Sequence, residues 1–247
     1  MGFALMAAFF VCAVAEAQTG LLDRVGTLID SVARGLNLVG ERSEKVIGPS
    51  LQLPGDLHSV DLANLETATH QFDESYPVGR PAVISVTNEF GPIHVSSWDS
   101  QVVRVEAEIA VSAASLDIAK QVAKAIEIHV TETGTRLDIG TLLPDTRNLG
   151  NVVTEVGYHV TVPKSASLEL DNYFGDTLVR DVAGGLSLRS RYGSVDLGNI
   201  GGPAHVQAIG EFPLKVRGLA EGGHFTLRGL NAEFYDVGGT LVIGNYL

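Results

Sequence analysis

Acidic side chains recur through the second half of this 247-residue chain and are the first groups that could do chemistry. Carboxylates that lie close together can act as general acid and base or can hold a calcium ion. The carboxylates that could gather on one face of the fold are Asp171, Asp176, Asp181, Asp196 and Asp236. The second interpretation is a solvated acidic face that keeps the protein soluble, and we favour it.

Histidine, cysteine and serine form no catalytic or metal-binding motif in this sequence. The seven histidines are His58, His70, His94, His129, His159, His205 and His224. None of them has the H-x-H, H-x-x-x-H or H-E-x-x-H spacing of a zinc site, and the single cysteine is Cys12. No serine lies in a G-x-S-x-G turn, and no glycine pair leads into the helix and lysine of a phosphate loop. We therefore expect no catalytic residue, no metal and no cofactor.

Charge and aromatic residues bear on the class of partner. The net charge of −12 argues against nucleic acid, which requires clustered lysine and arginine. The arginines that alternate with acidic residues, and so predict no basic stripe, are Arg180, Arg189, Arg191, Arg217 and Arg228. The tyrosines that recur near predicted turns are Tyr173, Tyr192, Tyr235 and Tyr246. Tyrosines in such a row can stack on sugar rings, but stacking inside the turns explains them more simply.

A repeated unit positions these residues. From Ala82 onward, apolar and polar residues alternate in short runs that are separated by glycine turns. Each unit has a strand, a polar turn in which an aromatic residue precedes glycine, and a second strand. Copies occupy 83–95, 168–179, 186–197, 205–216 and 225–237. Glycine pairs between the copies, Gly184-Gly185, Gly201-Gly202, Gly222-Gly223 and Gly238-Gly239, recur at steps of 17, 21 and 16 residues.

A fixed period near 18 residues, as between Gly175 and Gly193, is typical of a β-solenoid. Stacked coils would place Leu168 and Leu170 against Leu186 and Leu188 of the next coil. The predicted turn positions are Asn88, Phe90, Gly91, Asn172, Phe174, Gly175, Tyr192, Gly193 and Gly210. At these turns we expect the aromatic residues to stack coil on coil and the glycines to adopt positive φ. The alternative fold is an antiparallel sandwich of similar hairpins.

Residues 102–162 interrupt the repeat and are interpreted as a small α/β lid on the start of the solenoid. The segment contains a strand at 102–109, a helix from Ser115 to Ile126 with Ser115 as N-cap, a hairpin around Gly134, and a strand at 156–162 that ends at Pro163. Such a lid would cover a sheet edge that could otherwise recruit other chains. Trp98 and Asp99 are expected to anchor the first turn.

The first 64 residues are interpreted as a leader. Residues 1–17 contain an apolar run that ends in Ala15-Glu16-Ala17, the form of a signal-peptidase site, which predicts export and a mature chain beginning at Gln18. The alternative is a retained N-terminal anchor. Residues 18–64 are interpreted as an amphipathic helix followed by a linker, with an apolar stripe at 21–39 that requires a partner surface. We expect the linker character to continue through residues 48–75.

The residues of the first unit and its surroundings resemble a known family. Asn88-Glu89-Phe90-Gly91-Pro92-Ile93-His94-Val95 followed by Trp98-Asp99, the short helix, Val160-Thr161-Val162-Pro163 and the stepped glycine turns resemble the bacterial DUF4097-type adhesin family, whose function is unknown. The resemblance covers about 65–247. It implies a secreted or envelope-associated β-helical domain and transfers no catalytic residues.

These observations predict an all-β fold, a right-handed β-solenoid-like repeat with a small α/β lid and an N-terminal amphipathic helix. The predicted function is a non-enzymatic, exported binding, adhesion or assembly module of the cell envelope. The alternatives are a polysaccharide-active β-helix enzyme, an envelope-stress regulatory accessory protein and, less consistent with the repeat, a hexapeptide acyltransferase. A cell-surface glycan, an envelope protein or a second copy at the solenoid end are the partners that we consider.

Overall fold

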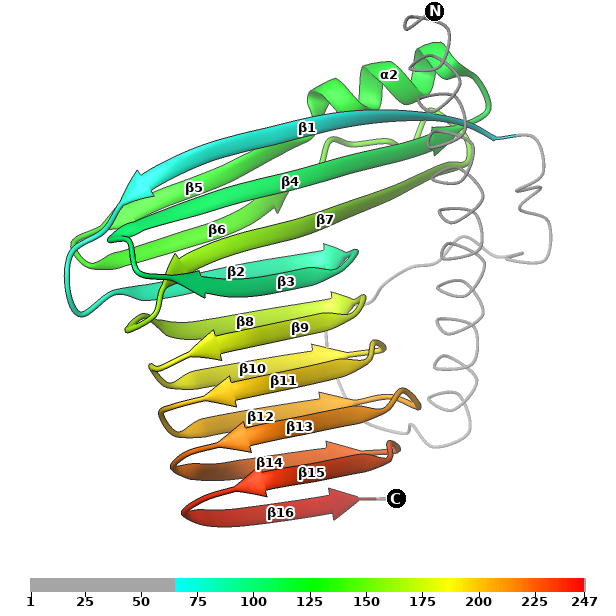
Figure 1. Ribbon diagram of the computed structural model, residues 1–247. Coiled ribbons are helices and arrows are strands. Elements are labelled where there is room, and N and C mark those ends of the chain that lie inside the picture. Colours follow the sequence, from blue (N-terminus) through cyan, green and yellow to red (C-terminus); the bar gives the residue numbers. More distant parts are fainter. Residues whose placement is uncertain (1–64, 247) are drawn as a thin grey trace, which may run out of the picture.

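The computed structural model describes residues 65–246, which form two facing eight-stranded sheets (Figure 1). Sheet A has the strand order β1-β4-β7-β3-β9-β11-β13-β15, and sheet B has the order β16-β14-β12-β10-β8-β2-β6-β5. The strands are β1 (Glu66–Pro77), β2 (Val83–Phe90), β3 (Ile93–Trp98), β4 (Val102–Ala113), β5 (Glu127–Thr133), β6 (Arg136–Leu142), β7 (Val152–Pro163), β8 (Ser167–Phe174), β9 (Thr177–Val182), β10 (Leu186–Arg191), β11 (Val195–Ile200), β12 (Ala204–Ile209), β13 (Leu214–Leu219), β14 (Gly222–Arg228), β15 (Ala232–Val237) and β16 (Thr240–Tyr246).

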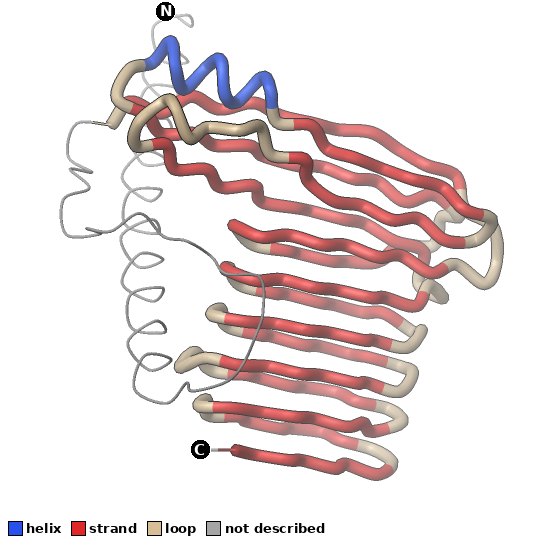
Figure 2. The backbone as a smooth tube through the Cα atoms, turned by 180° about the vertical axis from the view of Figure 1, so that it is seen from behind, coloured by secondary structure: helices blue, strands red, loops and turns tan. Residues whose placement is uncertain are grey.

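From β8 onward, the chain forms a regular stack of coils (Figure 2). Consecutive strands alternate between the sheets, so each coil contributes one strand to sheet B and the next to sheet A. Strands of neighbouring coils pair in parallel, as β8 with β10 and β9 with β11. Parallel pairing between coils confirms the solenoid-like repeat and excludes the antiparallel sandwich, while the hand of the coil stays a prediction.

The core lies between the two sheets because every second side chain of each strand points inward. Leu186 pairs in register with Leu168 and Leu188 with Leu170, as the repeat predicted. All four side chains are buried, each at 3% exposure or less. Burial of one such leucine contributes about 1.5–3 kcal/mol, and the stack extends this contact from coil to coil.

Residues 102–163 close the first end of the core. β4 and β7 continue sheet A, and β4 pairs antiparallel with both β1 and β7. β5 and β6 form a hairpin that continues sheet B beside β2. The segment expected to be a lid therefore extends the two sheets by pairing with them, since its strands carry the same inward apolar alternation as the coils.

The only helix in the described residues is α2 (Leu116–Ala125), which packs against β1 and β4 at this end (Figure 1). Ser115 is its N-cap, as predicted, because the Ser115 Oγ accepts a hydrogen bond from the Ile118 N–H. Ala119, Val122 and Ala123 join the core, so the helix covers apolar residues between the sheets. No helix within 65–246 is long and apolar enough to cross a membrane.

The prediction of a linker across residues 48–75 is wrong from Glu66 onward. β1 pairs with β4 along its whole length, from Glu66 opposite Ala113 to Pro77 opposite Val102. It is an edge strand whose only buried residue is Ala68, so its sequence lacks the apolar alternation that marks the other strands. The predicted signal peptide at 1–17 and the predicted helix and linker up to residue 64 lie outside the described residues.

Candidate functional site

The predicted turn residues lie at the loops that join sheet B to sheet A. The Asn88 side-chain amide donates to the carbonyl oxygens of Gly91 (3.0 Å) and Val156 (2.7 Å). The Asn172 amide one coil later donates to the carbonyl oxygen of Gly175 (2.9 Å) and to the Thr177 hydroxyl (3.2 Å). Both asparagines are buried, so each stabilises its turn by satisfying main-chain oxygens that water cannot reach.

Three aromatic rings form a stack beside these turns. Phe90 lies over Phe174 with ring centroids 5.5 Å apart, and Phe174 lies over Tyr192 at 5.2 Å, both pairs nearly parallel. Each ring belongs to a different coil and precedes the glycine of its own turn. The stack therefore joins three successive coils, which is a structural role for these residues.

The turn glycines are close to one another and not all of them share one backbone conformation. Gly91, Gly175 and Gly210 have positive φ, but Gly193 does not, and Tyr192 takes the positive φ of that turn instead. The expectation of positive φ at Gly193 is therefore wrong. A Cβ atom on Gly193 would overlap the Gly175 carbonyl, so the residue is small because of its neighbour.

The sequence analysis did not predict a second column of residues, which lie in sheet A and have positive φ. The residues with positive φ in the strands of sheet A are Asp181 (60°), Asn199 (56°), Gly218 (76°) and Asp236 (54°). Each is skipped in the pairing of its strand while the residues on either side pair in register, as Gly198 with Arg180 and Ile200 with Val182, so the ladder is interrupted at the same place in successive coils. The signal in the sequence is an Asp, Asn or Gly near every eighteenth residue, since these residues tolerate positive φ best.

The five aspartates do not converge. Asp171 pairs with Arg191 (3.2 Å) on sheet B, and Asp196 pairs with Arg180 (2.7 Å) on sheet A. Asp176 accepts from the Ser194 N–H and hydroxyl, and Asp181 accepts from the Asn199 amide at 2.7 Å. Four of the five thus contact a residue of a neighbouring coil, a more specific role than the solvated acidic face that we favoured.

Histidines pair across coils at two places. The His94 and His159 rings meet edge to face at 4.8 Å, and the His205 and His224 rings stack at 5.6 Å. His129 and His159 are exposed. Across residues 65–246, no group of three His, Cys, Asp or Glu side chains is placed to hold a metal ion.

Trp98 contributes to the first turn through its indole N–H, which donates to the Val102 carbonyl at 2.7 Å. Asp99 next to it pairs with Lys164 at 3.0 Å. The first contact joins β3 to the start of β4 and the second joins it to the residue that follows β7, and the indole ring is half-buried.

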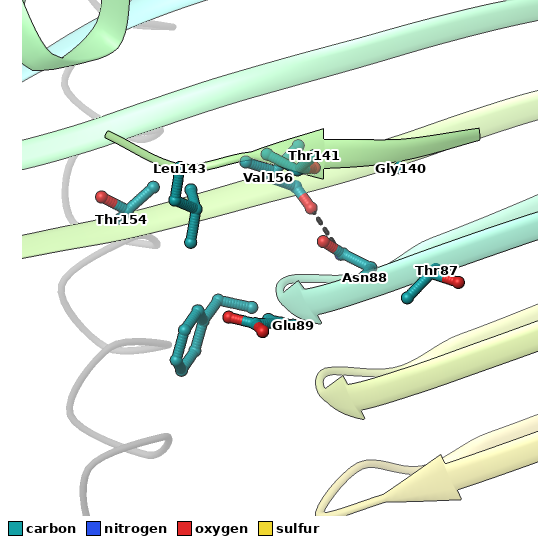
Figure 3. Close-up of a pocket in the computed structure, with 9 residues that line it drawn as sticks. Thr87, Asn88, Glu89, Gly140, Thr141, Leu143, Thr154 and Val156 are labelled. Carbon is teal, nitrogen blue, oxygen red and sulfur yellow. Dashed lines mark hydrogen bonds between the residues drawn. The ribbon is translucent and has the colours of Figure 1, made fainter. Parts of the chain in front are cut away.

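A pocket of about 140 Å³ lies where β2, β6 and β7 meet (Figure 3). Its lining consists of Thr87, Asn88, Glu89, Phe90, Gly140, Thr141, Leu143, Thr154 and Val156. Glu89 is the one titratable group of this lining, and the Asn88 amide is already bonded to the Val156 carbonyl. A single exposed carboxylate beside hydroxyl groups offers hydrogen bonds but no acid–base pair.

Beside this pocket, Tyr158 lies in the core of sheet A. Its hydroxyl and that of Thr141 are 2.6 Å apart, and the ring has no exposed surface. Burial raises the pKa of Tyr158 to about 12, because the phenolate would lose its hydration, and the Thr141 hydrogen bond opposes this in part.

The outer surface of the last coils carries a different kind of site, which we call the basic face. It comprises the outward side chains of β10, β12, β14 and β16: Ser187, Arg189, Arg191, His205, Gln207, Ile209, His224, Thr226, Arg228, Val242 and Tyr246. These four strands contain no aspartate and no glutamate, although the chain has 29 acidic residues. The expectation of no basic stripe is therefore wrong.

The reason for that error is the alternation between sheets. Asp196, which separates Arg191 from Arg217 in the sequence, and Glu233, which follows Arg228, lie in β11 and β15 of sheet A. Glu211 and Glu221 lie in the turns. From β10 onward, Arg189, Arg191 and Arg228 lie on sheet B, whereas every acidic residue lies on sheet A or in a turn, which a linear count of charges does not reveal.

The comparisons with known proteins identify no family for this chain. No protein-family model and no curated protein matches it. Among solved structures, it is similar to a putative cell adhesion protein from Clostridium sporogenes, with 9% identity, a TM-score of 0.36, and coverage of 74% of this chain and 100% of the other. It is also similar to a putative adhesin from Bacteroides fragilis, with 12% identity, a TM-score of 0.26, and coverage of 72% and 97%. Similarities this low do not establish a shared ligand or role.

Proposed function

We propose that this protein is a non-enzymatic, exported module of the cell envelope that binds an extended ligand on the outside of its solenoid. The observation that carries the proposal is the register of the coils. Outward residues of successive strands lie opposite one another, as Arg191 with Ile209 and Ile209 with Arg228. Columns of side chains about 4.8 Å apart form a flat repeated surface, which suits a repeated ligand better than a small substrate.

The placement of the acidic residues supports a binding role over polysaccharide cleavage. A glycosidase needs two carboxyl groups about 5–10 Å apart across one cleft. The candidate aspartates are divided between sheet A, sheet B and the turns, and four of them bind residues of a neighbouring coil. The pocket supplies a single carboxylate, from Glu89.

Export is a part of the proposal that rests on the sequence of residues 1–17. Expression in a bacterial host followed by cell fractionation and N-terminal sequencing tests it directly. We expect the protein outside the cytoplasm with Gln18 as its first residue. A chain that keeps Met1 and stays in the cytoplasm would refute export.

Binding is tested by screening the mature protein against arrayed glycans and isolated envelope fractions. We expect saturable retention on at least one envelope component, with no release of soluble sugar. Release of oligosaccharides would favour the enzyme alternative instead. The absence of binding to all fractions would refute the module.

A further inference from the structure

The basic face has a charge that is opposite to that of the whole molecule. Arg189 and Arg191 lie two residues apart on β10, and Arg228 lies two strands away on β14. The net charge of the chain is −12. A local cationic surface attracts anionic groups at short range, although the net negative charge of the protein does not attract them from a distance.

Two of these arginines have no internal partner. Arg191 pairs with Asp171 at 3.2 Å and lies 5.0 Å from the centre of the Tyr173 ring. Arg189 and Arg228 are exposed, and neither makes an ion pair within the described residues. Most other arginines of the fold, such as Arg104, Arg136 and Arg180, are paired with carboxylates. The free guanidinium groups are therefore available to an external anion.

We propose that the basic face binds a linear anionic polysaccharide, one that carries carboxylate or sulfate groups along its length. This inference rests on the proposed binding function and names the class of its ligand. The polymer lies along the column Arg191, Ile209, Arg228 and Tyr246, parallel to the stacking direction of the coils. At the β10 end of this column, Arg191 is held by Asp171, and Arg189, two residues away on the same face, supplies the unpaired cation.

The spacing of this column suits alternating charged and uncharged sugars. Arg191 and Arg228 are two strand separations apart, about 10 Å, with Ile209 between them. A polysaccharide with one acidic group per disaccharide presents its charges at intervals of two sugar rings. Ile209, which lies between the two arginines, then contacts the uncharged sugar ring. The exposed Tyr246 offers a stacking surface at the end of the column.

The rest of the face provides hydrogen-bonding groups for hydroxyls. Gln207 and Thr226 lie opposite each other in register, and the stacked rings of His205 and His224 lie in the next column. Further along sheet B, Glu169 and Asp171 of β8 reverse the charge. A DNA duplex, with one charge about every 1.7 Å along its axis, would meet those carboxylates within a short distance, so we favour the more sparsely charged polysaccharide.

The test measures binding of the mature protein to immobilised hyaluronan, which has one carboxylate per disaccharide, and to neutral dextran, with a single-stranded DNA oligonucleotide as competitor. We expect retention on hyaluronan but not on dextran, and weaker binding as salt rises. Arg189→Glu combined with Arg228→Glu should lower the affinity at least about tenfold. The matched control is Arg217→Glu on sheet A, which is compared with the single variant Arg228→Glu; the charge change is then equal, and the control should alter the affinity less than about twofold.

Thermal melting of each variant tests whether a loss of affinity comes from unfolding. We expect unchanged melting temperatures, since none of these three arginines makes an ion pair in the described structure. Equal binding by the double variant and the control would overturn the inference, as would displacement by DNA in preference to the polysaccharide. Binding to a neutral glycan or an envelope protein, unaffected by the double variant, would also overturn it. That last result would leave the proposed binding function intact, whereas no binding at all would remove both.

Discussion

Single residues at the turns determine how closely the coils can approach. A Cβ atom on Gly175 would overlap the Gly91 carbonyl, and one on Gly193 would overlap the Gly175 carbonyl. Only Gly175 of the two also has positive φ, at 151°. The same small residue is thus required for two different reasons in neighbouring coils.

Replacement of either turn glycine by valine should destabilise the protein. We expect Gly175→Val and Gly193→Val each to lower the free energy of unfolding by more than about 1 kcal/mol, because main chain would have to move. Urea unfolding measures the change. Gly140→Ala is the control, since its Cβ atom would meet nothing closer than the Thr87 carbonyl oxygen at 3.8 Å and its φ is not positive. Valine variants as stable as this control would contradict the turn geometry.

Tyr158 gives stability a dependence on alkaline pH. Its pKa is raised from about 10 in the unfolded chain to about 12 by burial, so the folded state retains the proton longer. The stabilisation is fully present below pH 10 and is lost as the pH rises through 12.

Tyr158→Phe should remove this dependence. In the wild-type protein, we expect the free energy of unfolding to fall by about 2 kcal/mol more across this pH range than in the phenylalanine variant. Urea unfolding at several values between pH 8 and pH 11.5 provides the comparison. The variant also loses the Thr141 hydrogen bond, which shifts its stability equally at all lower pH values. Parallel pH profiles for the two proteins would show that the ring is hydrated.

At the scale of elements, a buried polar column crosses from β2 to β10. Asn88, Asn172 and Ser190 occupy the same position in successive strands of sheet B. The Asn172 amide satisfies carbonyls of its turn, but the Ser190 hydroxyl is buried without a hydrogen-bond partner. Asn88 and Asn172 thus form hydrogen bonds within this column, and Ser190 does not.

Alanine substitutions should separate these two cases. Asn172→Ala leaves the Gly175 and Asp176 carbonyls without their side-chain donor and should cost about 2 kcal/mol or more of unfolding free energy. Ser190→Ala removes an unsatisfied hydroxyl and should leave stability unchanged or slightly higher. Chemical denaturation of both variants gives the values. An equal loss in both would indicate that the Ser190 hydroxyl bonds to the unpaired Asn172 Oδ1.

The solenoid strands were predictable because their signal is local and repeated. Period-two alternation defines the inward leucines such as Leu168 and Leu186, and glycine marks the turns between them. β1 was missed because an exposed edge strand buries almost nothing and so shows no alternation. The helix α2 was found with its N-cap because serine before a run of helical spacing is a local signal as well.

The candidate site was harder to predict than the fold. Arg191 and Arg228 lie 37 positions apart in the sequence and share a column only because two complete coils separate them. Residues of β11 and β13 intervene in the sequence but lie on the other sheet. Assigning each strand to its sheet, and then counting charge over the neighbouring strands β10, β12, β14 and β16, is the step that makes the basic face visible.

For the whole molecule, the question is whether a bound metal contributes to the stability of the coils. Many contacts between coils already involve acidic residues, as Asp176 with Ser194 and Asp181 with Asn199. Other pairs are Asp171 with Arg191 and Asp196 with Arg180. These carboxylates thus form protein contacts at separate places along the stack.

Calcium and chelators should therefore have no effect on thermal stability. A ligand that binds only the folded state raises the melting temperature by mass action, and a calcium site requires about six to eight oxygen ligands at one place. Residues 65–246 offer no group of even three candidate ligands. We expect the melting temperature of the mature protein to agree within error in excess EDTA and in millimolar Ca²⁺. A rise with Ca²⁺ that EDTA reverses would show that carboxylates gather elsewhere, in another part of the chain or between copies of it.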